Sequence, residues 1–275
     1  MKVAASEVLD RAERAREILR RCELCPRRCR VDRTAGEKGF CGLTDAAHCV
    51  REVLHYGEEE ELCPSHQVYF AGCNLRCEWC SVADWNVSPT EYPELDVPAT
   101  VERIARRRAE GARTLNLLGG EPTVSLYGIL RLLAETPADA CVVWNSNMYF
   151  DPVAVELLDG VVDVYLADFK CGNADCAERL LGAADYVEVV KERLADARRA
   201  ADLIVRYLVL PGHETCCMEP IFAWLAETMR DVKVSIRTDY LPPVETVSAP
   251  ANPADEAEIA RAEACAEEFG LTVIR

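Results

Sequence analysis

The sequence predicts an α/β protein whose core is a partial (β/α)6 barrel, preceded by a small cysteine-rich N-terminal segment. From residue 67 onward, short apolar runs alternate with helical stretches in about six β-then-α units. The runs are almost continuously apolar, which is typical of parallel strands covered by helices. The part of the chain that follows residue 67 is short for a closed eight-fold barrel, which usually takes roughly 250 residues. An open barrel therefore fits better.

The elements can be placed along the chain in order. The expected strands are Gln67–Ala71, Thr114–Leu118, Ala140–Trp144, Val162–Ala167, Leu203–Leu210 and Val232–Ile236. The helices expected between them are Val101–Ala109, Ser125–Glu135, Pro152–Leu158, Ala184–Arg199 and Glu219–Met229. A last helix, Pro253–Phe269, leads to a terminal strand, Leu271–Ile274. Helical and strand patterns thus alternate to the end of the chain.

The N-terminal part of the chain has a different pattern. A helix is expected over Ser6–Arg21, because apolar residues such as Val8, Ala12 and Leu19 fall on one side. The segment that follows is rich in cysteine, arginine and glycine and has little periodicity, so we expect it to need a metal to hold it. We therefore divide the chain into residues 1–62, the N-terminal helix and metal-binding segment, and residues 63–275, the barrel with its C-terminal helix and strand.

Composition and charge exclude several classes of protein. No apolar run approaches the roughly 20 residues of a membrane-spanning helix, and the charged first 20 residues lack the apolar stretch of a secretory signal. The net charge of −16 would repel a phosphate backbone. We expect a cytoplasmic protein that has neither nucleic acid nor a membrane as its partner.

Three cysteines lie close together directly after the first predicted barrel strand. The chain has 15 cysteines, and in a reducing compartment such a number indicates metal binding or redox chemistry rather than disulfides. Cys73, Cys77 and Cys80 would lie at the carboxyl end of the strand, where sites in such sheets form. Three thiolates leave one iron of a four-iron cluster open for a ligand. A zinc knuckle is the alternative, but structural zinc favours four ligands, commonly in two separated pairs.

The loop Gly72-Cys73-Asn-Leu-Arg-Cys77-Glu-Trp-Cys80 resembles the signature of the radical S-adenosylmethionine (SAM) superfamily. The wider match, from about Cys22 to Pro242, is similar to the branch related to pyruvate formate-lyase activating enzymes. The resemblance implies a [4Fe–4S] cluster whose open iron binds the amino and carboxylate groups of SAM. It also implies reductive cleavage of SAM to methionine and a 5′-deoxyadenosyl radical that abstracts a hydrogen atom.

A glycine pair closes the second predicted strand. Gly119 and Gly120 would let the backbone approach a ligand closely, although a simple turn is the alternative interpretation. Together with Glu121, the pair resembles the motif that binds the amino group of SAM in this superfamily. The resemblance implies that Gly119 and Gly120 line the SAM site and that Glu121 makes the polar contact.

The third predicted strand ends in Asn145 and Ser146. In the activating enzymes the corresponding stretch starts with an aspartate and helps to form a cation and SAM-ribose site. This sequence has Asn145 at that position and Met148 where a glycine is usual. The resemblance implies that Asn145 and Ser146 contact SAM, whereas the departure at Asn145 argues against a cation site.

Charged residues end the fourth strand and occupy the fifth. Asp168 and Lys170 are two residues apart, so they point to the same side of a strand and would either pair or both face the ligand. Resemblance to the activating enzymes favours a catalytic role, because the matching motif lines their active site. Arg206 lies within an apolar strand, where a buried guanidinium needs an anion. We expect the SAM carboxylate to be that anion.

Two further groups of cysteines suggest metal binding. Cys22, Cys25, Cys29 and Cys41 provide four thiolates, enough for a closed zinc site or a second iron–sulfur cluster, and the spacing does not choose between them. Cys171, Cys176, Cys216 and Cys217 are expected on loops at the barrel mouth, as ligands of another cluster, as radical-relaying thiols or simply packed. His213, in the loop after Pro211-Gly212, is a further candidate, with a surface position as its alternative.

Three functions follow from these observations. The first is a radical SAM enzyme that acts on a partner protein, as in glycyl-radical activation. The second is the same chemistry on a small molecule or peptide, and the third is a non-catalytic iron–sulfur or zinc protein. The third is disfavoured because such a protein needs neither an open iron nor a glycine pair at the barrel mouth. The radical chemistry would also need an electron donor such as flavodoxin or ferredoxin.

Overall fold

Eight strands form one open, curved sheet in the computed structural model of the chain, which describes residues 3–274. Their spatial order follows the chain, from β1 to β8, and the two end strands are not paired with each other. β1 is antiparallel to β2, and every other neighbouring pair is parallel. The strands are β1 (Cys49–His55), β2 (Ser65–Phe70), β3 (Thr114–Gly119), β4 (Cys141–Ser146), β5 (Val164–Asp168), β6 (Asp202–Leu208), β7 (Lys233–Arg237) and β8 (Thr272–Ile274).

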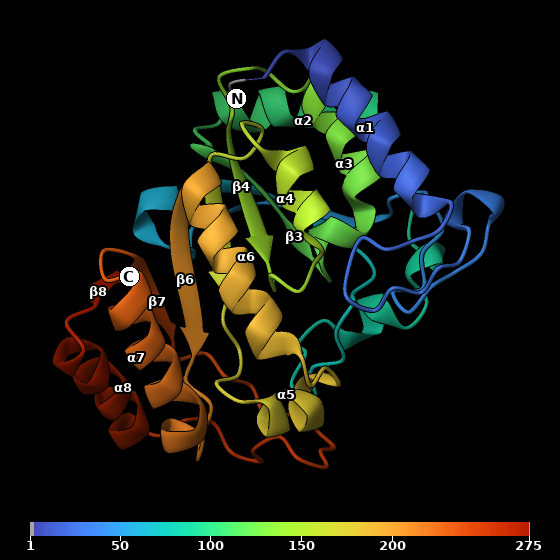
Figure 1. Cartoon of the computed structure of the whole chain (residues 1–275). Helices are drawn as coiled ribbons and strands as arrows, with labels where there is room; N and C mark the ends of the chain where they lie inside the picture. Colours follow the sequence, from blue (N-terminus) through green and yellow to red (C-terminus); the bar gives the residue numbers. More distant parts are fainter. Residues whose placement is uncertain (1–2, 275) are drawn as a thin grey trace.

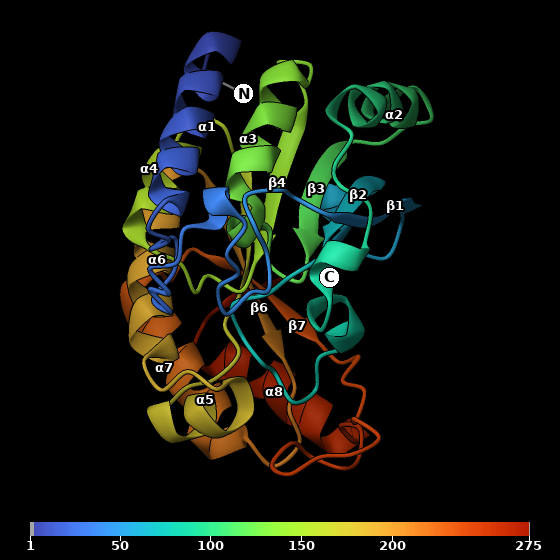
Figure 2. The same cartoon turned by 90° about the vertical axis from the view of Figure 1, so that its right-hand side faces the viewer.

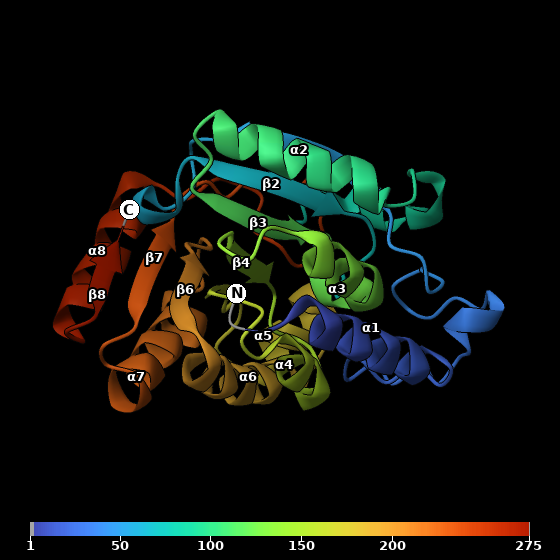
Figure 3. The same cartoon turned by 90° about the horizontal axis from the view of Figure 1, so that it is seen from above.

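Helices accompany this sheet, and Figures 1 and 3 show most of them on its outer face. They are α1 (Ala5–Leu19), α2 (Val97–Ala109), α3 (Leu126–Glu135), α4 (Pro152–Leu158), α5 (Ala174–Leu181), α6 (Tyr186–Ala200), α7 (Glu219–Thr228) and α8 (Glu256–Glu268). The short polar side chains that precede them fix their starts. Asp96, Asp151 and Asp255 each accept a backbone N–H in the first turn of α2, α4 and α8, respectively. Proline follows at the first turn of α2 and α4, where its missing N–H costs nothing.

The predicted fold class is confirmed, and two elements were missed. All six predicted barrel strands are present as β2 to β7, and the terminal strand is β8. The missed strand β1 carries Arg51 and Glu52 in a half-buried pattern, so its composition does not mark it as a core strand. The missed helix α5 has only 8 residues, begins at the Asn173 cap and ends at Gly182 in the left-handed conformation. No helix within residues 3–274 has the length and apolar character needed to cross a bilayer.

Both ends of the predicted 1–62 segment pack against the barrel. α1 lies beside α3 (Figure 2), and its buried face of Val8, Ala12, Ala15 and Leu19 belongs to the main hydrophobic core. β1 extends the sheet by pairing with β2. The cysteine-rich stretch between them forms a loop at the side of the molecule, near the lower end of α1 in Figure 1. Between α1 and β1, this loop has no regular structure beyond one short 3-10 turn, Arg33–Ala35, and an isolated bridge at His48.

Candidate active site

The carboxyl ends of β2 to β7 open into one cleft of about 1170 Å³, including its open mouth. Parallel strands collect their carboxyl ends at the same edge, so residues far apart in the sequence meet there. Nine residues predicted from the sequence line this cleft: Cys73, Cys77, Cys80, Gly119, Gly120, Asn145, Asp168, Lys170 and Arg206. Two others, Glu121 and Ser146, do not.

The three-cysteine loop starts immediately after β2. Gly72 turns the chain at a φ of +87°, and Cys73 follows with only 8% of its surface exposed. The backbone N–H of Leu75 donates to the Cys73 Sγ at 3.4 Å, and the Asn147 Nδ2 lies 3.7 Å from the same sulfur. The Asn86 Nδ2 lies 3.9 Å from the Cys80 Sγ. Donors of this kind stabilise a thiolate more than a thiol.

The electrostatics of the loop require a positively charged group. Burial raises the pKa of Cys77 to about 12, although the nearby Lys170 ammonium acts in the opposite direction. Burial also raises the pKa of Cys73, and repulsion from Cys77 and Glu121 adds to it. A bound cationic centre would favour the thiolate forms of Cys73 and Cys77 by compensating their charge. The donor set fits an iron–sulfur cluster held through three of its irons, with Cys73, Cys77 and Cys80 as ligands.

The glycine pair at the end of β3 packs directly against this loop. Gly119 has a φ of +132°, and a Cβ there would lie 2.1 Å from the carbonyl oxygen of Phe70. A Cβ on Gly120 would lie 2.2 Å from the carbonyl oxygen of Gly72. The backbone N–H groups of Gly120 and Glu121 donate to those two carbonyls at 2.8 and 2.9 Å. Glycine is thus required at both positions because the turn packs directly against the end of β2 and the cysteine loop.

Glu121 lies beneath the cleft floor rather than in the cleft. Its side chain is fully buried and accepts hydrogen bonds from the backbone and hydroxyl of Thr123, from the Ser146 hydroxyl and from the backbone N–H of Asn147. Burial raises the pKa of Glu121, against the effect of these hydrogen bonds. In this geometry Glu121 and Ser146 position the Gly119–Gly120 turn and Asn147, and neither reaches the space where SAM was expected to contact them.

Asn147 directly follows the two residues, Asn145 and Ser146, that were assigned to the site at the end of this strand, and it was not assigned with them. It lines the cleft, and its Nδ2 donates to the Asn74 Oδ1 at 2.9 Å, while the N–H of Tyr149 donates to the Asn147 Oδ1 at 2.8 Å. The side chain therefore connects the end of β4 to the three-cysteine loop. Tyr240, which follows β7 and also lines the cleft, was missed too. Both residues lie just beyond the end of a parallel strand, and this position in the sequence could have indicated that they line the cleft.

Asp168 and Lys170 form an ion pair at the cleft wall, which was one of the two alternatives for them. The Lys170 Nζ lies 2.7 Å from the Asp168 Oδ2, and both side chains remain partly exposed. Burial alone would lower the pKa of Lys170, but the negative charges of Asp168 and Cys77 outweigh it and raise the pKa well above its ordinary value. The Tyr186 hydroxyl donates to the carbonyl of Asp168 and accepts from the N–H of Lys170, which fixes the backbone between them. The ion pair with Asp168 thus favours the ammonium form of Lys170 beside the cysteine loop.

Arg206 already has anionic partners within the chain. Its guanidinium forms ion pairs with Glu58 and Glu59, from the connection between β1 and β2, and Glu59 is fully buried. Arg206 therefore does not need the SAM carboxylate to balance its charge, which was the reason for expecting that contact. Arg206 does line the cleft, next to Asp168 in the register of β5 and β6.

The N-terminal cysteines converge in a loop that contacts the three-cysteine loop. Cys22, Cys25 and Cys41 are buried, and Cys29 is partly exposed. The fully buried Arg33 donates to the Thr44 and Val124 carbonyls, and its Nη1 lies 3.8 Å from the Cys22 Sγ. Arg33 thus anchors the loop to the barrel and offsets thiolate charge.

Two arginines connect the N-terminal loop to the three-cysteine loop. The Arg27 Nε donates to the carbonyl of Asn74 at 2.9 Å, and the Arg76 Nη2 donates to the carbonyl of Phe40 at 2.6 Å. Both guanidinium groups lie 4.1 Å from the centre of the Phe40 ring. The two cysteine sets therefore occupy adjoining parts of one structure.

The fold and the site together define a class of protein: an open, mostly parallel α/β barrel with a three-cysteine loop after its first parallel strand and a glycine pair after the next. The sequence pattern of the radical SAM superfamily matches residues 68–225, which make up more than half of the chain. The chain belongs to the radical SAM superfamily.

Individual proteins and solved structures are also similar to this chain. The uncharacterized protein MJ0674 of Methanocaldococcus jannaschii is 35% identical over 239 residues, which cover 84% of this chain and 69% of that protein. The solved structure of a radical SAM methyltransferase from Sphaerobacter thermophilus superimposes with a TM-score of 0.52 at 14% identity, over 99% of this chain and 93% of that one. At this identity the likeness concerns the fold.

A further similar structure is that of SuiB from Streptococcus suis, with a TM-score of 0.55 at 15% identity. The match covers 75% of this chain but only 47% of SuiB, so this chain spans about half the length of that protein. SuiB has also been crystallised with its precursor peptide SuiA and with SAM.

Proposed function

We propose that this chain is a radical SAM enzyme in which Cys73, Cys77 and Cys80 hold a [4Fe–4S] cluster at the barrel mouth. The observation that carries the proposal is the convergence of these three thiols with Gly119, Gly120 and other polar strand ends on one cleft. Superfamily membership supports the same cofactors, the cluster and SAM. Cluster and SAM together supply the chemistry of one-electron reductive cleavage, which yields a 5′-deoxyadenosyl radical for hydrogen abstraction.

In this scheme the protein's own residues would bind and orient SAM. Gly119, Gly120 and Asn145 line the cleft beside the cysteine loop and would contact a ligand bound there. The Lys170 ammonium, held 2.7 Å from Asp168, would offset the negative charge of the thiolates or of a bound carboxylate. The Asp168–Lys170 pair is therefore the candidate catalytic pair at the cleft wall. Arg206 would contact a SAM carboxylate only while its guanidinium also kept its ion pairs with Glu58 and Glu59.

The substrate is proposed to be a protein, as in activating enzymes that generate a glycyl radical. An exposed apolar loop beside the cleft supports a macromolecular partner: Leu241, Val244 and Val247 are all largely exposed. The carboxylate of Glu78, within the three-cysteine loop, holds this segment by accepting from the backbone N–H groups of Ser248 and Ala249, each at 2.8 Å. A peptide substrate would use the same surface. A flavodoxin or ferredoxin is the expected electron donor.

Product analysis tests the chemistry. The anaerobically reconstituted protein, given dithionite and SAM, should release 5′-deoxyadenosine, and the Cys77→Ala variant should release none. Cys141→Ala is a matched control because Cys141 lies at the opposite, amino end of β4. No 5′-deoxyadenosine from a protein with a fully loaded cluster would overturn the proposal.

A separate experiment tests the substrate class. A glycyl-radical enzyme encoded beside this chain should acquire the doublet electron paramagnetic resonance signal of a glycyl radical when incubated with the reduced enzyme and SAM. Hydrogen transfer to a small molecule or peptide, with no radical on such a protein, would favour the alternative substrate class.

A further inference from the structure

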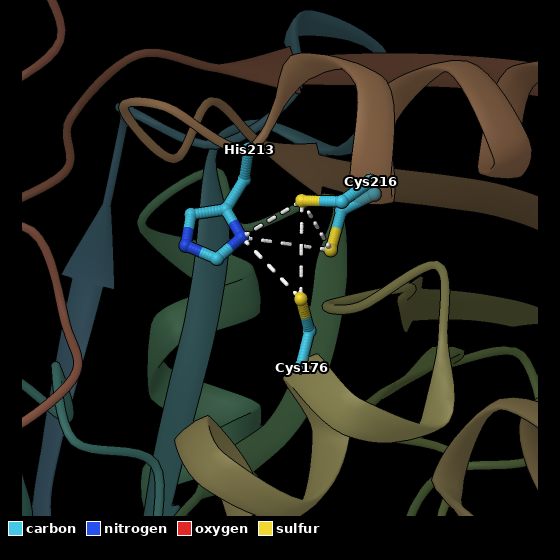
Figure 4. Close-up of side chains that lie close together, drawn as sticks. Cys176, His213 and Cys216 are labelled. Atoms are coloured by element: carbon cyan, nitrogen blue, oxygen red, sulfur yellow. Dashed lines mark hydrogen bonds between the residues drawn. The ribbon is translucent and has the colours of Figure 1, made fainter.

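Three cysteines and a histidine from two separate connections meet beside the barrel mouth. Cys176 lies in the first turn of α5, which follows β5, and not on a loop as the sequence had suggested. Cys216 and Cys217 lie within the π-helical turn Glu214–Met218 that follows β6, and His213 directly precedes this turn. Figure 4 shows Cys176 pointing from α5 toward His213 and Cys216. Cys171, which was grouped with these cysteines in the sequence, is not a member of the set, and His213 takes its place.

The four ligand atoms are mutually close. The His213 Nδ1 lies 3.6 Å from the Cys176 Sγ, 3.3 Å from the Cys216 Sγ and 3.8 Å from the Cys217 Sγ. The Cys216 Sγ lies 3.8 Å from the Cys176 Sγ and 4.0 Å from the Cys217 Sγ. All the atoms fall within 4.8 Å of one another.

These separations match those of a single tetrahedral ion. With zinc–sulfur bonds of about 2.3 Å and zinc–nitrogen bonds of about 2.05 Å, tetrahedral angles place two sulfurs about 3.8 Å apart and a sulfur and a nitrogen about 3.5 Å apart. A four-iron cluster binds each ligand to a different iron and so holds its ligating atoms farther apart. Within residues 3–274, no other group of three or more histidine, cysteine or acidic side chains meets this criterion, and the N-terminal cysteines do not.

The surroundings hold the four side chains in place. The Asn173 side chain caps α5 by accepting from the N–H of Cys176 at 2.8 Å, and its Nδ2 donates to the carbonyl of Cys216 at 2.6 Å. The same Nδ2 lies 3.3 Å from the Cys176 Sγ, and the Arg179 Nη2 lies 3.7 Å from it. These donors would stabilise thiolate ligands from outside, as partners of metal ligands commonly do.

The backbone allows the connection between β5 and α5 to lie close to the turn that follows β6. A Cβ on Gly172 would lie 2.5 Å from the carbonyl oxygen of Cys217, so only glycine lets the two connections come this close. The N–H groups of Cys217 and Met218 both donate to the carbonyl of His213, at 3.0 and 3.1 Å. Such π-helical turns are rare and are frequent at functional sites.

We propose that Cys176, His213, Cys216 and Cys217 form a closed, mononuclear site for a zinc-class divalent ion, separate from the two cysteine sets already described. Four protein ligands leave no open position, so the ion is structural. It links the start of α5 to the turn after β6. Because only the short stretch from Cys171 to Asn173 separates α5 from Lys170, the ion would fix the part of the cleft wall that carries Asp168 and Lys170.

Metal analysis of the whole protein tests the site. The double variant Cys176→Ser/Cys216→Ser should contain one equivalent of zinc per chain less than the unaltered protein, with iron unchanged. The matched control, Cys141→Ser/Cys265→Ser, removes two cysteines outside the group and should lose neither metal. Unchanged zinc in the first variant would overturn the proposal, and so would the loss of about four irons, which would indicate a cluster.

A conservative variant keeps the test independent of folding. His213→Cys preserves four ligands, so the variant should keep its metal. After cobalt substitution, its ligand-field bands should shift relative to those of the unaltered protein, as expected when one nitrogen ligand is replaced by sulfur. Identical cobalt spectra of the two proteins would show that His213 is not a ligand and would overturn the assignment.

Discussion

The Glu121 carboxylate accepts hydrogen bonds from a backbone N–H and a hydroxyl of Thr123, from the Ser146 hydroxyl and from the N–H of Asn147, all in the interior of the barrel. A charged group with no exposed surface is tolerated only when it is fully hydrogen-bonded. Glu121 therefore joins the turn after β3 to the end of β4, and the shape of the cleft floor depends on it.

We expect Glu121→Ala to lower the free energy of unfolding by about 3 kcal/mol, because several buried donors lose their acceptor. Urea unfolding under anaerobic conditions measures this change. Glu135→Ala, at an exposed position near the end of α3, should change the stability by less than about 0.5 kcal/mol. If Glu121→Ala is as stable as the unaltered protein and loses only SAM affinity, Glu121 contacts SAM directly.

Met148 stands where the activating enzymes usually have a glycine, and its backbone conformation is the one that a glycine would adopt. Its φ is +59°, in the left-handed region that favours glycine, and its side chain is fully buried. The turn is held by the N–H of Met148, which donates to the Ser146 Oγ at 3.0 Å, and by the N–H of Tyr149, which donates to the Asn147 Oδ1. The turn therefore keeps the backbone conformation for which a glycine is usual, and the methionine side chain packs into the core.

At the scale of elements, the edge strand β1 depends on one buried carboxylate. Glu52 on β1 binds the His66 Nε2 of β2 at 3.1 Å and an Arg103 nitrogen of α2 at 2.6 Å. Burial alone would raise the pKa of Glu52, but the hydrogen bonds from His66 and Arg103 outweigh it and hold the pKa below its ordinary value of 4.5. The single side chain thus connects two strands and a helix.

We expect Glu52→Gln to lower the free energy of unfolding by about 2 kcal/mol at neutral pH. The fold favours the ionised carboxylate, so this contribution is complete above the unfolded-state value of 4.5 and is lost as the pH falls through the lower folded-state pKa. The stability difference between the two proteins should therefore shrink below pH 4.5, as paired unfolding curves would show. Glu61→Gln, which removes an exposed ion pair with Lys233, should have little effect at any pH.

At the scale of the whole molecule, the N-terminal loop and the barrel mouth form one continuous structure through Arg27, Arg76 and Phe40. The N-terminal cysteines influence one another's charge, since repulsion from Cys41, Cys22 and Cys29 adds to the burial that raises the pKa of Cys25 to about 12. Their sulfurs are not gathered as closely as a single tetrahedral ion requires. A closed zinc site and an auxiliary iron–sulfur cluster are the two alternatives for this second metal site, and they differ in metal content.

The double variant Cys22→Ala/Cys25→Ala, prepared without oxygen, should lose about four irons per chain and keep its zinc. It should retain the cluster at Cys73, Cys77 and Cys80, visible as the SAM-dependent change of its electron paramagnetic resonance spectrum. Loss of one zinc with iron unchanged would instead identify a closed zinc site. Cys49→Ala/Cys63→Ala, outside all three cysteine sets, is the control.

The strand and helix pattern of the barrel, the three-cysteine loop and the glycine pair could all be predicted from the sequence. Each of these is a local signal: hydrophobic periodicity within one element, or ligand spacing within nine residues. The strand β1 and the helix α5 could not be predicted, because β1 is stabilised by its pairing with β2 and α5 is short and depends on its cap. Their own composition does not specify them.

The sequence by itself determined the fold class and the residues that reach the barrel mouth, because parallel strands bring their carboxyl ends to one edge. Only the tertiary structure decided which side chains meet across the chain. Arg206 pairs with Glu58 and Glu59, 148 and 147 residues away, and Cys176 meets His213 at a separation of 37 residues. Such pairings depend on strand register and on how separate connections approach each other, and no local pattern of residues encodes either.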